Sequence, residues 1–310
     1  MERNLLIALD DSRHSRLAAK YAGAFFASDQ QVRFDLLNIQ PPLSDFLVEE
    51  AKRKASARQK LDRLYRENTA HAKKILADVV EALKQGGIAE ERIETHPLPY
   101  NQGKAKDILD FATRGRFDAI VLGRRGVSGW QDMLFGSVSN NIIQQSQVVP
   151  VWMVDGQPPS GKILVPVDGS SHSLRAVDHL AFILAGRQDN ALVFFHVQPK
   201  LRQYCTIDFD SATAEPLEEL VATGDRQCID NFYGQAQKKL AEAGIEESQF
   251  EIKTSTGLSS VGSQIVKELE SGRYQTVVMG RSGGSRNYFM GSVAQQVIGK
   301  ATDCAVWIVP

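Results

Sequence analysis

The sequence predicts an α/β fold with two tandem domains, each a five-stranded parallel sheet with helices on both faces. The chain of 310 residues repeats itself: LLIALDDSRHSRLA at residues 5–18 is matched by ILVPVDGSSHSLRA at 163–176, and further blocks recur in the same order. Within each copy, short apolar runs alternate with amphipathic stretches. Continuously apolar strands between helices are typical of a parallel sheet that is covered on both sides.

We expect the first domain at residues 1–156 and the second at 157–310, because the Gly- and Pro-rich stretch DGQPPSGK reads as a linker. In the first copy, strands are expected at 4–9, 32–39, 91–98, 118–122 and 148–154, and helices at 13–27, 60–85, 104–114 and 137–146. In the second copy, strands are expected at 162–167, 191–197, 249–255, 275–279 and 304–309, and helices at 172–186, 225–243, 260–271 and 292–300.

Two segments differ between the copies. Residues 43–60 contain EEAKRKASARQK, whose mixed acids and bases favour a solvated helical extension over a partner surface. Residues 200–224 lack clear periodicity, and we expect an irregular excursion there.

Composition excludes several classes of protein. The formal net charge is −1, which argues against a broad nucleic-acid surface. No apolar run reaches the length of a membrane-spanning helix, and the first apolar run is too short for a secretory signal. The three cysteines have no metal-ligand spacing. Reduced thiols in a cytoplasmic protein are the simplest interpretation.

The stretch GRRGVSGWQDMLFGS, residues 123–137, is the first candidate for a binding site. Gly123 ends an expected strand, Gly126 can turn the chain, and Gly136 allows close approach of the backbone to a ligand. Ser137 is placed to cap the following helix, whose first N–H groups and dipole favour an anion. Ligands of open α/β sheets bind beyond the carboxyl ends of the strands, and this stretch follows such an end.

Several residues near these strand ends allow two interpretations. Arg124 and Arg125 either contact phosphate or are solvated loop charges. Asp10 either contacts the ligand or caps the next helix. His14 and His172 are interpreted as polar residues at helix starts, because no set of nucleophile, histidine and carboxylate can be read from the sequence. Neither a Walker loop nor a G-x-G-x-x-G turn after the first strand is present.

The spacing Gly123-x2-Gly126-x9-Gly136-Ser137, together with IALDDS and VPVDGS, resembles the universal stress protein family, and the resemblance covers nearly the whole chain twice. It implies the Rossmann-like fold of adenine-nucleotide α-hydrolases and an ATP site. By this resemblance, the nucleoside is contacted by Asp10 and the backbone at Ile39. The ribose and phosphates are surrounded by Gly123, Gly126, Gly136, Ser137 and Val138.

The second copy departs from this pattern. Gly280-x2-Gly283 fits, but only seven residues separate Gly283 from Gly291-Ser292. The resemblance still assigns Asp168, Val197, Gly280, Gly283, Gly291 and Ser292 to the second site. We expect domain 1 to be the competent ATP site and domain 2 to be altered.

Two functions remain open from the sequence. One is a cytoplasmic regulatory protein that binds ATP, with or without Mg²⁺, and signals through unknown protein partners. The other is a paired scaffold that binds another small ligand or none. Weak ATP hydrolysis lacks a recognisable base, so no enzymatic activity is expected. Relatives with one domain dimerise through the last strand, so Val148–Val154 and Ala305–Val309 are predicted to pair within the chain, with further homodimerisation left open. Neither nucleic acid nor a membrane is expected as a partner.

Overall fold

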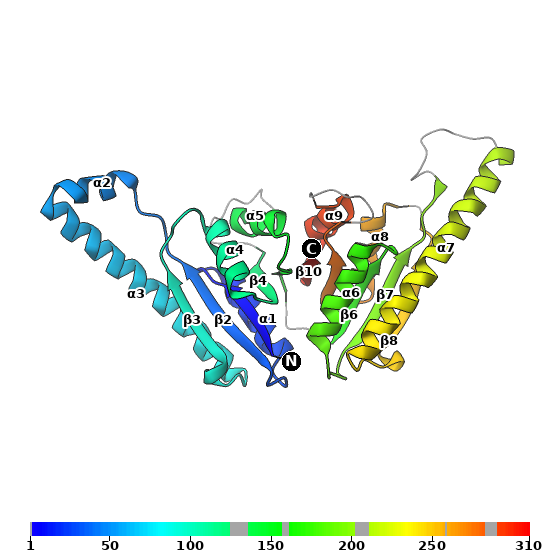
Figure 1. Ribbon diagram of the computed structural model, residues 1–310, viewed down its shortest axis with the longest axis horizontal. Coiled ribbons are helices and arrows are strands. Elements are labelled where there is room, and N and C mark those ends of the chain that lie inside the picture. The colour runs from blue at the N-terminus through cyan, green and yellow to red at the C-terminus, as the bar shows by residue number, and fades with distance from the viewer. Residues whose placement is uncertain (1, 125–135, 157–160, 202–210, 258, 283–289) are drawn as a thin grey trace. The chain divides into compact units, whose positions relative to one another are not determined.

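The computed structural model describes residues 2–124, 136–156, 161–201, 211–257, 259–282 and 290–310 (Figure 1). The chain divides into two compact units, Met1–Pro159 (unit 1) and Ser160–Pro310 (unit 2). Arg125, Gly126 and Gly283, which the sequence places in the two candidate sites, lie outside the described residues. Throughout the described ranges, every helix is too short or too polar to cross a membrane.

Unit 1 alternates strands and helices as the sequence predicts. Its strands are β1 (Arg3–Ala8), β2 (Val32–Ile39), β3 (Ile93–Leu98), β4 (Ala119–Gly123) and β5 (Val151–Val154). Its helices are α1 (Arg13–Phe25), α2 (Asp45–Arg53), α3 (Ala55–Gln85), α4 (Lys104–Gly115) and α5 (Ser137–Gln145), with a short 3₁₀ turn at Glu90–Arg92.

The unit 1 strands are parallel and lie in the order β3-β2-β1-β4-β5. Helices α1 and α3 pack on one face of this sheet, and α4 and α5 pack on the other. The chain runs outward from β1 to β3 and then returns to β4 on the other side of β1. Such a switch point opens a crevice at the carboxyl ends of β1 and β4, where an open α/β sheet binds its ligands.

Unit 2 repeats this arrangement. Its strands are β6 (Lys162–Val167), β7 (Ala191–Val197), β8 (Phe250–Ser255), β9 (Thr276–Gly280) and β10 (Ala305–Val309). Its helices are α6 (Ser171–Leu184), α7 (Ser211–Glu242), α8 (Val261–Ser271) and α9 (Ser292–Lys300), with a 3₁₀ turn at Glu247–Gln249. The parallel strands lie in the order β8-β7-β6-β9-β10. The predicted fold of two five-stranded parallel sheets is confirmed.

Several element boundaries differ from the sequence prediction, and three of them have a local explanation. Helix α7 begins at Ser211, so the irregular excursion expected at 200–224 is wrong from residue 211 onward. The run LEELVA after Pro216 consists mostly of good helix formers, and packing of the later turns on the sheet extends the helix. Strand β3 begins only at Ile93, because a 3₁₀ turn precedes it. Strand β5 starts directly after Pro150, in agreement with the preference of proline for strand starts.

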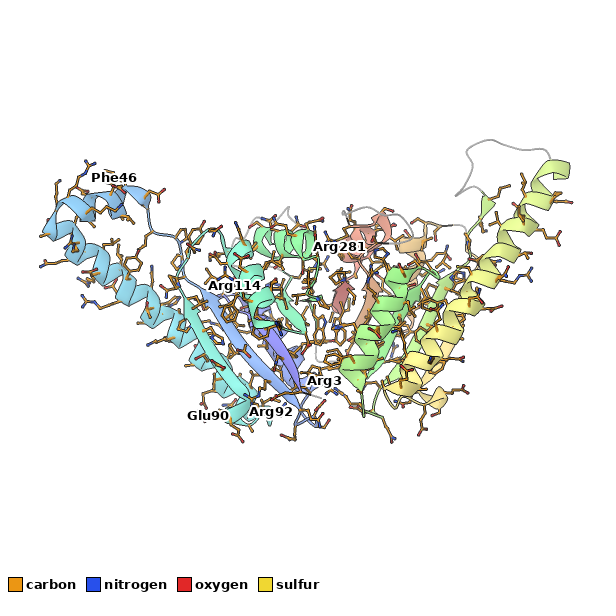
Figure 2. All side chains as sticks on the ribbon, viewed as in Figure 1. Arg3, Phe46, Glu90, Arg92, Arg114 and Arg281 are labelled. Atoms are coloured by element: carbon orange, nitrogen blue, oxygen red, sulfur yellow. The ribbon has the colours of Figure 1, made fainter. Side chains whose placement is uncertain are left out.

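Buried aromatic residues and two arginines fix the unit 1 sheet against its helices. Trp152 of β5 is fully buried and stacks with Phe26, with ring centroids 6.2 Å apart. At the amino-terminal edge of the sheet, Arg3 forms an ion pair with Asp29, and Arg92 Nη2 donates to the Asp29 carbonyl at 2.7 Å. Figure 2 shows Arg3 and Arg92 at this edge. These interactions therefore stabilise the end of the sheet at which the strands begin, opposite the carboxyl ends that form the candidate site.

Candidate functional site

A cavity of about 560 Å³, here called cavity 1, opens at the carboxyl ends of the unit 1 strands. Its volume lies in the range of ligand-binding pockets. Six of the predicted site residues line it, namely Asp10, Ile39, Gly123, Gly136, Ser137 and Val138. The walls also include side chains from α3 and α4, among them Asn68, His71 and Lys104. Residues that are far apart in the sequence are thus brought together at the switch point.

Asp10 orders the turn that leads from β1 into α1. Its Oδ1 accepts hydrogen bonds from Ser12 N at 3.1 Å and Ser12 Oγ at 2.5 Å. Ser12 is the N-cap of α1, and its Oγ accepts from Ser15 N at 3.2 Å. Asp10 therefore does not cap the helix directly. It holds the capping serine, and it also lines cavity 1.

Two amide side chains join the end of β2 to its neighbours. Asn38 Nδ2 donates to the Leu9 carbonyl at 2.9 Å, which ties β2 to the end of β1 beside Asp10. Gln40 Nε2 donates to Thr69 Oγ1 of α3 at 3.2 Å. Both amides are buried, so these bonds are retained with little competition from water. They hold Ile39 and α3 at the wall of cavity 1.

The first turn of α5 faces cavity 1. The sequence predicts Ser137 as the N-cap of this helix, but Gly136 occupies that position and Ser137 is the first helical residue. Glycine has no side chain to accept from the first N–H groups, and the described residues provide no side-chain cap. Gly136, Ser137, Val138 and Ser139 line cavity 1. A helix start of this kind can donate hydrogen bonds to an anion.

Gly123 is required by packing of the protein itself. A Cβ atom at this position would lie 2.5 Å from the His14 carbonyl carbon and 2.7 Å from Ser15 N, both backbone atoms of α1. This contact with α1 is a constraint on Gly123 that the sequence does not reveal. Ser139 Oγ donates to the Gly123 carbonyl at 2.8 Å, which fixes α5 to the end of β4.

Arg124 does not line cavity 1. Its side chain is only 2% exposed, and Nη1 donates to Asp155 Oδ2 at 3.0 Å. A guanidinium that is buried beside a carboxylate after β5 is held inside the unit. The predicted phosphate contact of Arg124 is therefore corrected to a structural ion pair.

A second cavity of about 370 Å³, here called cavity 2, occupies the corresponding place in unit 2. Predicted residues that line it are Asp168, Val197, Gly280, Gly291 and Ser292. Asp168 Oδ1 accepts from Ser170 N at 3.0 Å, and Ser170 caps α6, as Ser12 caps α1. Gly291 is the N-cap of α9, as Gly136 is of α5. A Cβ atom at Gly280 would lie 2.7 Å from the His172 carbonyl carbon, just as a Cβ atom at Gly123 would overlap the backbone of His14.

Cavity 2 has walls that the sequence prediction did not include. His196, Asp225 and Arg281 line it. Burial lowers the pKa of Arg281. The sequence repeat places His196 at a strand end, as it places Asn38, but assigns it no role in binding. Asp225 falls at the expected start of a helix and carries no sequence signal of its own.

Another polar cluster lies on β2 and β3. Asp35 Oδ1 and His96 Nε2 are 2.6 Å apart, and Glu94 lies beside them. Burial raises the pKa of Asp35. The His96 ring lies 4.9 Å from that of Phe111 on α4, so this pair sits between the sheet and a helix. None of the three residues lines cavity 1.

The chain matches the model of the universal stress protein family twice, at residues 1–155 and 159–310. It belongs to the universal stress protein family. The two matches agree with two tandem universal stress protein domains, as the sequence predicts.

Two universal stress proteins match different shares of this chain. The universal stress protein YxiE of Bacillus subtilis is 28% identical over 154 residues, which are 50% of this chain and 99% of YxiE. A universal stress protein from Archaeoglobus fulgidus superposes with a TM-score of 0.61 at 20% identity, covering 98% of this chain and 97% of that chain. YxiE thus has the length of one repeat, whereas the archaeal universal stress protein matches both.

Proposed function

We propose that this universal stress protein binds an adenine nucleotide in cavity 1 and acts as a cytoplasmic regulator of a stress response. ATP, with or without Mg²⁺, is the expected ligand. The observation that carries this proposal is that the first turn of α5, which has no side-chain cap among the described residues, faces the same 560 Å³ space as Asp10. N–H donors suit the phosphates, and a carboxylate suits the hydroxyl groups of a ribose.

The polarity along cavity 1 supports one orientation of the nucleotide. The phosphates would meet the main chain of Gly136, Ser137 and Val138, and Lys104 would add a positive charge. The base would lie toward Ile39 and the apolar side chains of α3 and α4, such as Ile75 and Ile108. Most ligand pockets combine an apolar wall with a few oriented polar groups.

The decisive experiment is titration calorimetry of ATP on Gly136→Leu, with the matched variant Gly291→Leu in unit 2. We expect Gly136→Leu to abolish binding at cavity 1, because the new side chain would occupy the space at the helix start. Gly291→Leu should leave binding at cavity 1 intact. Circular dichroism and thermal unfolding check that both variants fold. An unchanged number of ATP molecules bound per chain, at unchanged affinity, in a folded Gly136→Leu protein would refute the proposal.

The rival function is a paired scaffold that binds a different small ligand or none. Mass spectrometry of the small molecules that purified protein releases on denaturation separates the two. Adenine nucleotide supports the proposal, and any other ligand supports the rival. We infer a binding role without catalysis. Phosphate release from ATP that disappears in Gly136→Leu would instead indicate hydrolysis.

The proposed regulator would act through protein partners that the sequence does not name. The intrachain pairing of the last strands of the two domains and further self-association also stay predictions. Light scattering of the full chain, with and without ATP, measures the number of copies in solution.

A further inference from the structure

Cavity 2 contains a buried polar pair that cavity 1 lacks. His196 is the penultimate residue of β7 and is 4% exposed. Its Nδ1 lies 3.0 Å from the Val167 carbonyl oxygen, and its Nε2 lies 2.9 Å from Asp225 Oδ2 on α7. Both residues line cavity 2. The ring therefore joins the end of β6, directly before Asp168, to the long helix that forms one wall.

Unit 1 has uncharged amides at the corresponding positions. Asn38 is the penultimate residue of β2, and its Nδ2 donates to the carbonyl of Leu9, directly before Asp10. Asn68 of α3 corresponds to Asp225 of α7, because each lies the same number of residues before the end of its helix. The two helix ends match in their hydrogen bonds: Ile88 N donates to the Leu83 carbonyl, and Ile245 N donates to the Leu240 carbonyl. The two cavities thus share one anchoring bond, but only in cavity 2 does the anchor carry an ionisable ring and a carboxylate partner.

The geometry of the pair has a consequence for its protons. A carbonyl oxygen only accepts hydrogen bonds, and so does an ionised carboxylate. Because each ring nitrogen of His196 faces one of these acceptors, both contacts are hydrogen bonds only when both nitrogens carry a proton. The imidazolium form then neutralises Asp225. A neutral ring would lose one of the two bonds and leave a carboxylate without a matching charge in the cavity wall.

Among the described residues that line cavity 2, the other charged groups are Asp168 and Arg281, which follow β6 and β9. On the neighbouring strand, His196 is paired in register with Thr254, which has no charge. Helices α8 and α9 contribute residues without charge to the cavity, namely Val261, Ile265, Ser292, Val293 and Ala294. On α7, the titratable residues within two turns after Asp225 are Arg226, Cys228, Asp230 and Tyr233.

We propose that His196 and Asp225 are specificity-determining residues that make cavity 2 a proton-dependent site for an anionic, nucleotide-sized ligand. The ligand class rests on the proposed function. With the imidazolium in place, the pair is neutral and Arg281 adds positive charge to the wall. Loss of the ring proton leaves Asp225 as a net negative charge that repels phosphate, and it also weakens the tie between β7 and α7. Binding at cavity 2 should therefore be coupled to the ring proton and weaken when this proton is lost.

Cavity 1 provides the internal control. Its anchor Asn38 does not titrate, and its nearest histidine pair is exposed: His71 Nε2 lies 3.9 Å from Asp11 Oδ2, with both side chains more than half exposed. Solvent screens a pair of this kind. The pH dependence of cavity 1 should therefore be shallow, apart from the titration of ATP itself, which affects both cavities equally.

The test measures ATP affinity at about pH 6 and about pH 8 in two backgrounds. Gly136→Leu reports cavity 2, and Gly291→Leu reports cavity 1. We expect the affinity of cavity 2 to fall about tenfold more than that of cavity 1. Adding His196→Asn, which installs the unit 1 residue, or the isosteric Asp225→Asn to the Gly136→Leu background should remove this extra slope.

A second measurement examines the pair without nucleotide. Ring ¹⁵N shifts of His196, followed across the pH range, should show a form in which both nitrogens carry a proton, and Asp225→Asn should disfavour this form because it removes the facing carboxylate. Equal slopes in the two cavities, or a ring that is neutral throughout, would overturn the inference. ATP binding at cavity 1 but not at cavity 2 at about pH 6 would overturn it while leaving the proposed function intact. Absence of ATP from both cavities would overturn both.

Discussion

The guanidinium of Arg124 donates to the carboxylate of Asp155 at 3.0 Å, and this ion pair joins the residue after β4 to the residue after β5. Arg124 directly follows Gly123, the first glycine of the candidate motif, where the sequence leaves open a phosphate contact and a solvated loop charge. Its burial instead makes it part of the support for the strand ends.

We therefore predict that Asp155→Asn lowers the free energy of unfolding by about 1–3 kcal/mol, because it leaves the buried guanidinium without its charge partner. Urea denaturation measures this loss. The affinity for ATP should change less than twofold or threefold, since neither residue lines cavity 1. A large loss of affinity for ATP at unchanged stability would indicate that this ion pair acts in ligand binding. Asp189→Asn is a suitable control, because its ion pair with Arg187 lies in unit 2 and its carboxylate is 59% exposed.

Gly123→Ala should destabilise unit 1 by about 1–3 kcal/mol, because the new Cβ would overlap the backbone of His14 and Ser15. Gly234→Ala is the matched control. Gly234 lies in α7, and a Cβ there would meet no atom within 4 Å, so the substitution should stabilise by about 0.5–1 kcal/mol. Thermal unfolding of both variants decides the point. An unfolding temperature of Gly123→Ala that is no lower than that of the unsubstituted chain would mean that the clash at Gly123 is relieved without cost.

Asp10→Asn separates the two roles of Asp10. The amide oxygen of asparagine can still accept from Ser12 N, so the turn and the α1 cap should persist, with little change in unfolding temperature. If the carboxylate contacts ribose hydroxyls, calorimetry should record about tenfold weaker ATP binding. Unchanged affinity would assign Asp10 to the turn alone. Asp168→Asn makes the same comparison in unit 2.

The stability of the chain should fall in mild acid because of His179. Burial lowers the pKa of this side chain to about 3, and its ring lies 6.1 Å from that of Trp307. In the unfolded chain the ring takes up a proton below its ordinary pKa of 6.5, whereas the folded state resists this proton. The contribution of His179 to the free energy of unfolding is therefore fully present above about pH 6.5 and is lost as pH falls toward about 3. The loss should be on the order of 1–3 kcal/mol, because the residue is half-buried.

Urea titrations at several pH values test this expectation with His179→Gln, which removes the titrating ring. The variant should lose part of the acid sensitivity even if it is less stable at neutral pH. His71→Gln, at an exposed position, should leave the pH dependence unchanged. An identical acid profile for His179→Gln and the unsubstituted chain would contradict the prediction.

The sequence determined the repeat, the alternation of strands and helices, and the strand ends at which Asp10 and Gly136 stand, because these features depend on local periodicity and on the order of elements. Tertiary structure decided which residues meet there. Arg124 turned inward because Asp155, far along the chain, follows a neighbouring strand. Gly123 proved to be constrained by the backbone of α1, and Asp225 reaches His196 from helix α7, a separate element. Contacts of this kind depend on distances between separate elements, which the packing of helices on the sheet sets and which local patterns do not encode.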